Sequence, residues 1–225
     1  MTTTLNMPQN AESQSTDTTI QATINSIIDE LITSLPDPKQ LSSGQRRGII
    51  ARYSSVLEGN FVYWMTAAVI ATKSEEAREE LLENLHEEVR DAHPAMLRRF
   101  AIAAHAFPTD VDALAINEDL TKVRLFLGRL SAVQSLVTMA FFEGFIQRFM
   151  GYLAELAAAQ GSSEMEYTDV HGVCDIEHTQ GLFRALASET EINPLGQGMD
   201  LYEGVYLLRS LIEEIVFNRK EAQAA

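Results

Sequence analysis

Cysteine and basic residues are scarce in this sequence. Its one cysteine, Cys174, excludes an internal disulfide framework and favours the reducing conditions of a cytoplasm. Lysine and arginine together number 17 against 32 acidic residues, so the formal net charge is −15. This charge argues against nucleic acid or an anionic membrane as a partner, because either would repel the average surface of the protein.

Long apolar segments are missing too, and so are the features of a secretory signal. The longest nearly apolar run, residues 61–72, is shorter than the ~18 residues that a membrane-spanning helix needs. Residues 1–17 have neither the basic nor the apolar region of a signal peptide. They are polar and rich in Thr, Ser, Asn and Gln, so we expect a disordered tail there. These absences predict a cytoplasmic protein that makes no membrane contact.

The rest of the chain has the composition of one globular domain. Hydrophobic residues make up 46% of the 225 residues and charged residues 22%, and at ~100–200 residues per domain we expect a single domain over residues 18–225. Apolar residues recur at helical steps, as at Ile20, Ile24, Ile27 and Leu31, and no useful strand-type alternation is present. The predicted helices cover about 20–35, 43–72, 74–93, 94–106, 117–160, 164–188 and 200–220. The fold class is therefore all-α, a bundle of seven helices.

Several helix ends are marked by residue type. Ser74 is a predicted N-cap, and His93-Pro94 predicts a break because proline restricts the residue before it and suits the first turn of a helix. Ser163 with Glu166, after Gly161, has the spacing of a capping box. Residues 128–131 predict only a bend within the long helix 117–160.

The most informative local pattern is His171, Asp175 and His178. At 3.6 residues per turn, positions i, i+4 and i+7 lie on one narrow strip of a helix, and Leu182 continues that strip toward the interior. Three such polar side chains are costly to bury unless something binds them. Taken alone, the triplet is equally well interpreted as a hydrogen-bonded polar strip in a helical core.

Further inward-facing ligands change that balance. Glu143 has apolar helical neighbours, Glu88 continues the stripe of Leu81 and Leu85, and His93 follows at the proline break. An ionised carboxylate on an apolar face needs a cation or a firm partner. By contrast, Glu80, Glu83 and Glu87 form a face that we expect to be solvated. For Glu58, an ordinary polar position on a long helix is as probable as a ligand role.

Together, three carboxylates and three imidazoles from several helices are typical of a carboxylate-bridged di-metal site in a helical bundle. Mixed nitrogen and oxygen ligands favour iron or manganese over structural zinc. A single-zinc hydrolase is disfavoured, because Arg90 stands where the second histidine after His86 belongs. A ferritin-like ligand pattern is also disfavoured, because only Glu83 and His86 have the Glu-x-x-His spacing.

Three segments resemble the haem-oxygenase-like di-iron oxidases, whose relatives in fold include the thiaminase-type TenA proteins. They are Asn84-Leu-His-Glu-Glu88 followed by His93, the Phe142-Glu143 pair, and the His171…Asp175…His178 helix. The similarity runs from about residue 58 to residue 187. It implies a haem-oxygenase-like bundle that binds two Fe(II) ions and uses O₂ as co-substrate. The order of all three segments carries the resemblance, because each segment alone is a weak signal.

The resemblance also implies roles for the residues. One iron would take Glu88, His93 and either His171 or His178, Glu143 would bridge the metals, and Asp175 would complete the second iron. Glu58 matches a position where some members supply an extra carboxylate, and Glu87 is an alternative to Glu88 because the spacing to His93 is short. Glu88, Glu143 and Asp175 are the expected catalytic carboxylates. Leu153 stands where the p-aminobenzoate-forming members carry a lysine, which disfavours their self-consuming chemistry.

By the same resemblance, the reaction is oxidation of a small molecule, with N-oxygenation, carbon–carbon cleavage, decarboxylation and nitrile formation as known outcomes. Aromatic residues crowd the helices that hold Glu58 and Glu143, namely Phe61, Tyr63, Trp64, Phe141, Phe142 and Phe145. They are interpreted first as core, but a pocket among them would suit an aromatic amino acid. The specific prediction is a nitrile-forming enzyme that acts on a tryptophan-like amino acid and assembles as a homodimer.

Two alternatives from other classes stay open. A metal-free TenA-like hydrolase would use Cys174 as its nucleophile, although the sequence shows no clear base and places Cys174 beside the ligand strip. A non-enzymatic helical binding protein would use the same buried polar residues only for packing.

Overall fold

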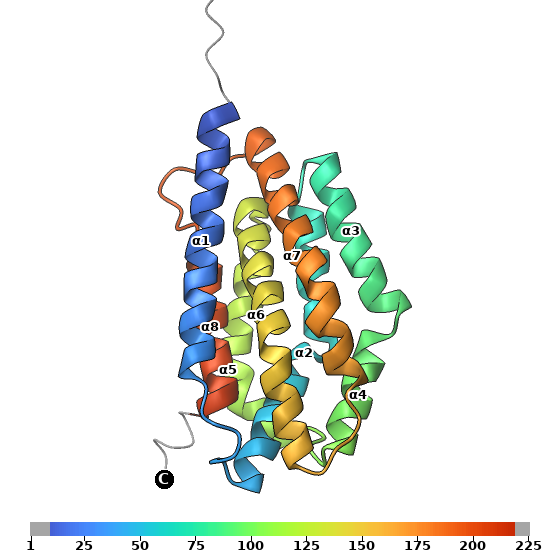
Figure 1. The fold of residues 1–225 in the computed structure, drawn as a ribbon. Coiled ribbons are helices and arrows are strands. Elements are labelled where there is room, and N and C mark those ends of the chain that lie inside the picture. Colours follow the sequence, from blue (N-terminus) through green and yellow to red (C-terminus); the bar gives the residue numbers. More distant parts are fainter. Residues whose placement is uncertain (1–9, 219–225) are drawn as a thin grey trace, which may run out of the picture.

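The computed structural model describes the backbone of residues 10–218 and the side chains of residues 19–218. This part of the chain forms eight helices and no strand (Figure 1). The helices are α1 (Asn10–Ser34), α2 (Ser43–Ala71), α3 (Glu75–Arg90), α4 (His93–Ala103), α5 (Asp110–Leu127), α6 (Ala132–Ala159), α7 (Glu166–Ile192) and α8 (Glu203–Phe217).

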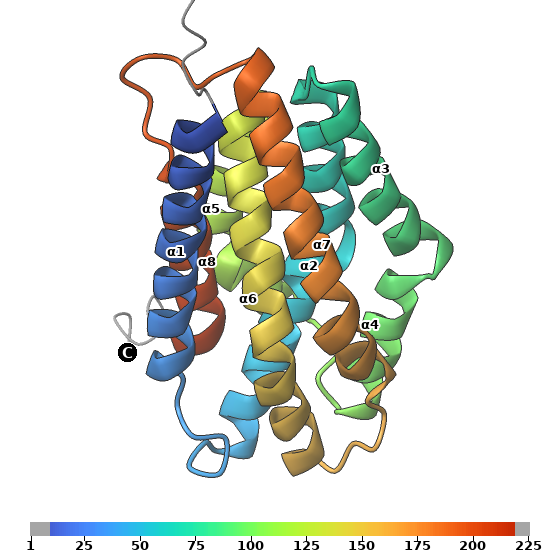
Figure 2. The ribbon, with the colours of Figure 1, turned by 45° about the horizontal axis from the view of Figure 1, so that its top comes forward.

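Helix α6 lies at the centre of the bundle. Every residue from 132 to 146 is buried, which is typical of a helix that is apolar on all sides and surrounded by others. It packs against α1, α2, α7 and α8. In both ribbon views α7 runs beside α6, and α3 and α4 lie on the far side of α7 (Figures 1 and 2). The helices that carry the candidate ligands are therefore neighbours.

Helix α2 is kinked next to this region. Glu58 and Gly59 leave the helical conformation, and Gly59 has φ +80°, in the left-handed region that glycine adopts most easily. The helix begins at a capping box in which Ser42 and Gln45 satisfy each other's backbone N–H groups. The kink divides α2 into two segments, and both segments contribute buried side chains to the core.

The all-α prediction is confirmed, but the predicted count of seven helices is wrong. The single helix predicted over 117–160 is two helices, because the chain turns at residues 128–131, where Leu130 has φ +57°. Helix α5 begins earlier than predicted, at Asp110, where Thr109 and Asp112 form a capping box.

Other predicted boundaries also differ. The Ser163–Glu166 capping box is absent, since Met165 is the N-cap of α7 and makes no side-chain cap, while Ser162 Oγ accepts a hydrogen bond from the Glu164 backbone. Of the predicted tail 1–17, residues 10–17 belong to α1, and residues 1–9 lie outside the described part. The predicted Ser74 cap is confirmed by its bond from the Ala77 N–H. The predicted homodimer stays a prediction.

None of the helices described within residues 10–218 combines the length and apolar character needed to cross a membrane.

Candidate metal centre

The break between α3 and α4 positions the first candidate ligands. Helix α3 ends at Arg90, Ala92 adopts a left-handed conformation with φ +58°, and α4 begins at His93, followed by Pro94. The chain bends here, and Glu88 Oε1 lies 2.9 Å from His93 Nδ1. Both side chains are buried. The proline break predicted from the sequence is thus what aims His93.

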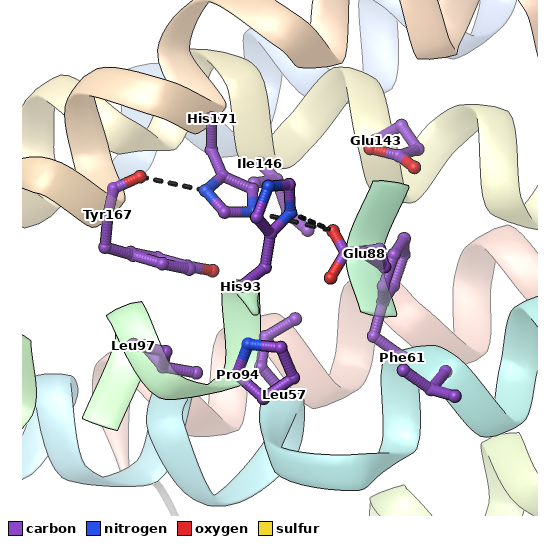
Figure 3. A pocket seen from close by; sticks show the side chains of 11 residues that line it. Leu57, Phe61, Glu88, His93, Pro94, Leu97, Glu143, Ile146, Tyr167 and His171 are labelled. Carbon is purple, nitrogen blue, oxygen red and sulfur yellow. Dashed lines mark hydrogen bonds and ion pairs between the residues drawn. The ribbon is translucent and has the colours of Figure 1, made fainter. Parts of the chain in front are cut away.

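Helix α7 adds His171 to this pair. His171 Nδ1 donates a 2.8 Å hydrogen bond to the Tyr167 carbonyl oxygen, so His171 Nε2 is the nitrogen directed at Glu88 Oε1, at 3.5 Å (Figure 3). Such a bond from the remote ring nitrogen is how metal-binding histidines are commonly oriented. One ligand atom from each of Glu88, His93 and His171 lies within 4.8 Å of the other two. The three residues form what we call the first ligand group.

The second ligand group lies further along α7. Cys174, Asp175 and His178 also offer ligand atoms within 4.8 Å of one another. His178 Nδ1 is 3.7 Å from Asp175 Oδ1 and 3.9 Å from Glu143 Oε1, and it has no hydrogen-bond partner within the described part of the chain. Asp175 is buried, and its Oδ2 likewise has no hydrogen-bond partner among these residues. Two buried, unsatisfied ligand atoms on neighbouring side chains are the pattern expected where an ion binds.

Glu143, on α6, lies between the two groups. Its carboxylate accepts a 2.7 Å hydrogen bond from Asn84 Nδ2, and both side chains are buried. Burial raises the pKa of Glu143 well above its ordinary value, and the charges of Asp175 and Glu88 raise it further. One carboxylate from each group therefore acts on Glu143, and a cation between them would relieve this repulsion.

Contacts between carboxylates and histidines shift the pKa values of Glu88 and His178. Burial lowers the pKa of His178, but the carboxylates of Asp175, Glu143 and Glu87 outweigh burial and raise that pKa to about 10. Burial alone would raise the pKa of Glu88, yet its contacts with His171 and His93 lower it to about 2. Carboxylates and imidazoles that bind protons in a buried site are also groups at which metal ions compete with protons.

The structure brings together six of the seven residues predicted as ligands: Glu88, His93, Glu143, His171, Asp175 and His178. It does not bring Glu58 to them. The Glu58 side chain is 41% exposed and pairs with Arg98 on α4. The α2 kink begins at Glu58, which explains why the helical spacing of the sequence does not place its side chain correctly.

The sequence pattern does not reveal two contacts of the site. The interpretation of Glu87 as a solvated residue is wrong, because Glu87 is only about one-third exposed and its Oε2 lies 2.9 Å from His178 Nε2. The second contact is that of Asn84 with Glu143, and its signal in the sequence is the position of Asn84 three residues after Leu81 and four before Glu88, on the inward face of α3.

Cys174 is poorly suited to act as a nucleophile. Burial raises the pKa of its thiol, the neighbouring Asp175 carboxylate raises it further, and Cys174 Sγ donates to Asp175 Oδ1 at 3.2 Å. A thiol held in its neutral form is a weak nucleophile. This environment argues against the metal-free hydrolase alternative.

An apolar pocket adjoins the first ligand group. Its lining combines Glu88, His93, His171 and Glu143 with Leu57, Phe61, Val62, Leu97, Ile146 and others (Figure 3). Its volume of about 20 Å³ is close to the space that one water molecule needs. Of the aromatic residues considered as pocket-forming, Phe61 alone lines it, whereas Trp64, Phe141, Phe142 and Phe145 are core and Tyr63 is 45% exposed.

Comparison with known proteins agrees with this donor set. A family model described as "Iron-containing redox enzyme", of the haem-oxygenase-like type, matches residues 50–207, which is more than half of the chain. No curated protein and no solved structure matches. The match includes both ligand groups and Glu143, so this chain belongs to the family of haem-oxygenase-like, iron-containing redox enzymes.

Proposed function

We propose that this protein is a non-haem di-iron oxidase or oxygenase that activates O₂ to oxidise a small molecule. The observation that carries the proposal is the pair of buried ligand groups, Glu88/His93/His171 and Asp175/His178, with Glu143 between them. Two ferrous ions held there would supply the electrons that reduce O₂. The position of His171 beside Glu88 and His93 favours His171 for the first metal and leaves His178 for the second.

The chain's own contribution is to orient the ligands and keep the site dry. The Tyr167 carbonyl fixes the orientation of the His171 ring, and Asn84 holds one oxygen of Glu143. Partners of this kind tune the affinity and geometry of a metal site. Leu57, Phe61 and Leu97 cover the first ligand group with apolar surface and limit the access of water.

The apolar lining supports a substrate with an apolar part, and we propose an amino acid with an apolar or aromatic side chain. Nitrile formation from a tryptophan-like amino acid is the specific form of this proposal. An indole ring is far larger than the space of about 20 Å³ in the pocket. Binding it therefore requires Leu57 and Phe61, which flank the α2 kink, to move away from Leu97 and Ile146.

Metal loading tests the proposal. Anaerobic incubation with Fe(II), followed by gel filtration and metal analysis, is expected to leave two irons per chain, and O₂ is expected to produce a transient visible absorption band. Glu143→Ala and His178→Ala are expected to lose metal, whereas Glu83→Ala, on the exposed face of α3, is expected to retain it. A wild-type protein that binds no iron and shows no band contradicts the proposal and favours a binding protein.

The substrate class is tested separately with the Fe(II)-loaded protein. Amino acids and fatty acids are added one at a time under anaerobic conditions, and O₂ consumption is followed after mixing with O₂. Apolar amino acids are expected to accelerate consumption, and mass spectrometry of the product then identifies the reaction. Acceleration by fatty acids alone contradicts the amino-acid assignment but leaves the di-iron assignment intact.

A further inference from the structure

A second pocket, with a volume of about 180 Å³, is lined by residues of α3 and α7. Its lining contains four carboxylates, Glu80, Glu83, Glu87 and Glu177, together with Asn84 and His178. We call it the acidic pocket. It differs in chemistry from the apolar pocket, and the two share no lining residue.

One guanidinium, that of Arg184, offsets part of the negative charge. Arg184 forms two hydrogen bonds with Glu80, of 2.8 and 2.9 Å, and is thereby committed to that carboxylate. Gly181 makes room for this pair, because a Cβ atom there would lie 2.6 Å from Glu80 Oε2. Counted without His178, the four carboxylates and one guanidinium sum to a formal charge of −3, and the lining stays negative when His178 is protonated.

The acidic pocket leads to the second ligand group. His178, whose side chain is 9% exposed, contributes to its lining and lies 2.9 Å from Glu87 Oε2. Asn84 is only 4% exposed and also lines the pocket, and its Oδ1 has no hydrogen-bond partner among the described residues. Asn84 Nδ2 donates its hydrogen bond to Glu143. Asn84 Oδ1 is therefore left as an oxygen that can ligate a cation at the inner end of the acidic pocket.

We propose that the acidic pocket is the transit site through which a divalent metal ion, Fe(II), reaches the buried ligands. Carboxylate and amide oxygens are the donors that hard divalent cations prefer, and here they lie between solvent and His178. Glu83 and Glu177 are exposed and attract the cation, and Glu87, Asn84 and His178 receive it at the inner end. This inference rests on the proposed metal-dependent function.

The charge of this pocket disfavours the substrate as its occupant. A fatty acid carries one negative charge, which Glu83, Glu87 and Glu177 would repel while Arg184 is held by Glu80, and an amino acid is a zwitterion with no net charge for the pocket to attract. A cation gains from the same charges. Focusing of the field by a charged cleft raises the association rate of an oppositely charged ligand by about tenfold or more, and this effect weakens with salt.

The rate of Co(II) binding tests the inference. The single tryptophan, Trp64, is fully buried and lies 5.2 Å from the Phe142 ring, next to Glu143, so a paramagnetic ion at the site is expected to quench its fluorescence. Stopped-flow quenching compares the wild type, the double variant E83Q/E177Q and the control E79Q/E191Q. The control removes the same charge from exposed positions of the same two helices, away from the pocket.

We expect E83Q/E177Q to bind Co(II) roughly three- to tenfold more slowly at low ionic strength. Its final Co(II) content by metal analysis should equal that of the wild type, and the difference in rate should shrink as salt is added. The control should bind at the wild-type rate. Equal slowing in the control, or no slowing in E83Q/E177Q, overturns the transit site while leaving the metal centre intact.

Two other results bear on the same inference. A lower final Co(II) content in E83Q/E177Q also overturns it, because the residues would then be permanent ligands. If the wild type binds no Co(II) and no Fe(II) at equilibrium, the proposed function fails and the transit site fails with it. These outcomes separate a wrong entry route from a wrong function.

Discussion

Asn84 donates the one hydrogen bond that the Glu143 carboxylate receives within the described part of the chain, a 2.7 Å bond from a buried amide on α3 to a buried carboxylate on α6. The bond links the helix that carries Glu88 to the central helix of the bundle. Since Glu143 stands between the two ligand groups, Asn84 controls the orientation of the residue that both metals would share.

The first prediction concerns this bond. Asn84→Ala leaves Glu143 without a donor, and loss of an outer partner of a metal ligand typically lowers metal affinity about 10- to 100-fold. We expect that loss in an anaerobic Fe(II) titration followed by calorimetry. Asn25→Ala removes an amide that accepts from Arg148 on the surface, and it should bind iron as the wild type does. Equal affinity in Asn84→Ala contradicts a positioning role.

Much of the centre could be predicted from the sequence, because its ligands lie on regular helices. His171, Asp175 and His178 share one face of α7, and the helical period places them without any tertiary information. The order of the helices and the break at Pro94 were also visible. Glu58 and Glu87 could not be placed in the same way. The backbone of α2 leaves the helix at Glu58, and the Glu87 side chain bends toward a histidine on another helix.

The fold differs from the sequence-based prediction where a short turn separates α5 from α6. Residues on both sides of 128–131 are apolar at helical spacing, so the sequence favours one long helix there. The left-handed conformation of Leu130 separates α5 from α6. A leucine with positive φ depends on the surrounding packing, and local propensity gives no sign of it.

The second prediction separates two consecutive glutamates. Glu88 is buried against His93 and His171, whereas Glu87 is about one-third exposed and its carboxylate contacts His178. Glu88→Ala removes a carboxylate of the first group, and we expect the iron content to fall from two per chain to one or fewer. Glu87→Ala should still bind two irons. The pair of variants differs by one position on the same helix, so each serves as the control for the other. Loss of iron in Glu87→Ala alone would assign the ligand to Glu87.

A third prediction follows from Asp112 at the start of α5. Its carboxylate accepts hydrogen bonds from Arg47 and from the Thr109 backbone, and these contacts outweigh burial and lower the pKa of Asp112. Because this pKa is lower in the folded state, the ionised carboxylate stabilises the fold above the ordinary aspartate pKa of about 4, and the contribution is lost as the pH falls below that value.

We therefore expect Asp112→Asn to lower the free energy of unfolding by about 1–3 kcal/mol at pH 7, in the range seen for lost caps and charge-assisted hydrogen bonds. The difference from the wild type should shrink as the pH falls below about 4. Urea unfolding at a series of pH values measures it. Asp110→Asn, an exposed residue in the same helical turn, should change stability by less than about 0.5 kcal/mol. A difference that is independent of pH would show that the ionised carboxylate is not responsible.

The last prediction concerns the kink of α2, where Gly59 has φ +80°. A Cβ atom at this position would meet nothing within 4 Å, so the cost of Gly59→Ala comes from the backbone alone. Placing alanine in the left-handed region costs about 1–2 kcal/mol, and we expect the free energy of unfolding to fall by that amount. Gly44→Ala, in the first turn of the same helix and equally free of contacts, should be neutral or stabilising by up to about 1 kcal/mol.

Because Leu57 and Phe61 flank the kink and line the apolar pocket, Gly59→Ala should also alter O₂ consumption with substrate, whereas Gly44→Ala should not. A Gly59→Ala protein as stable as the wild type would mean that α2 can straighten, and substrate turnover would then show whether the pocket needs the kink.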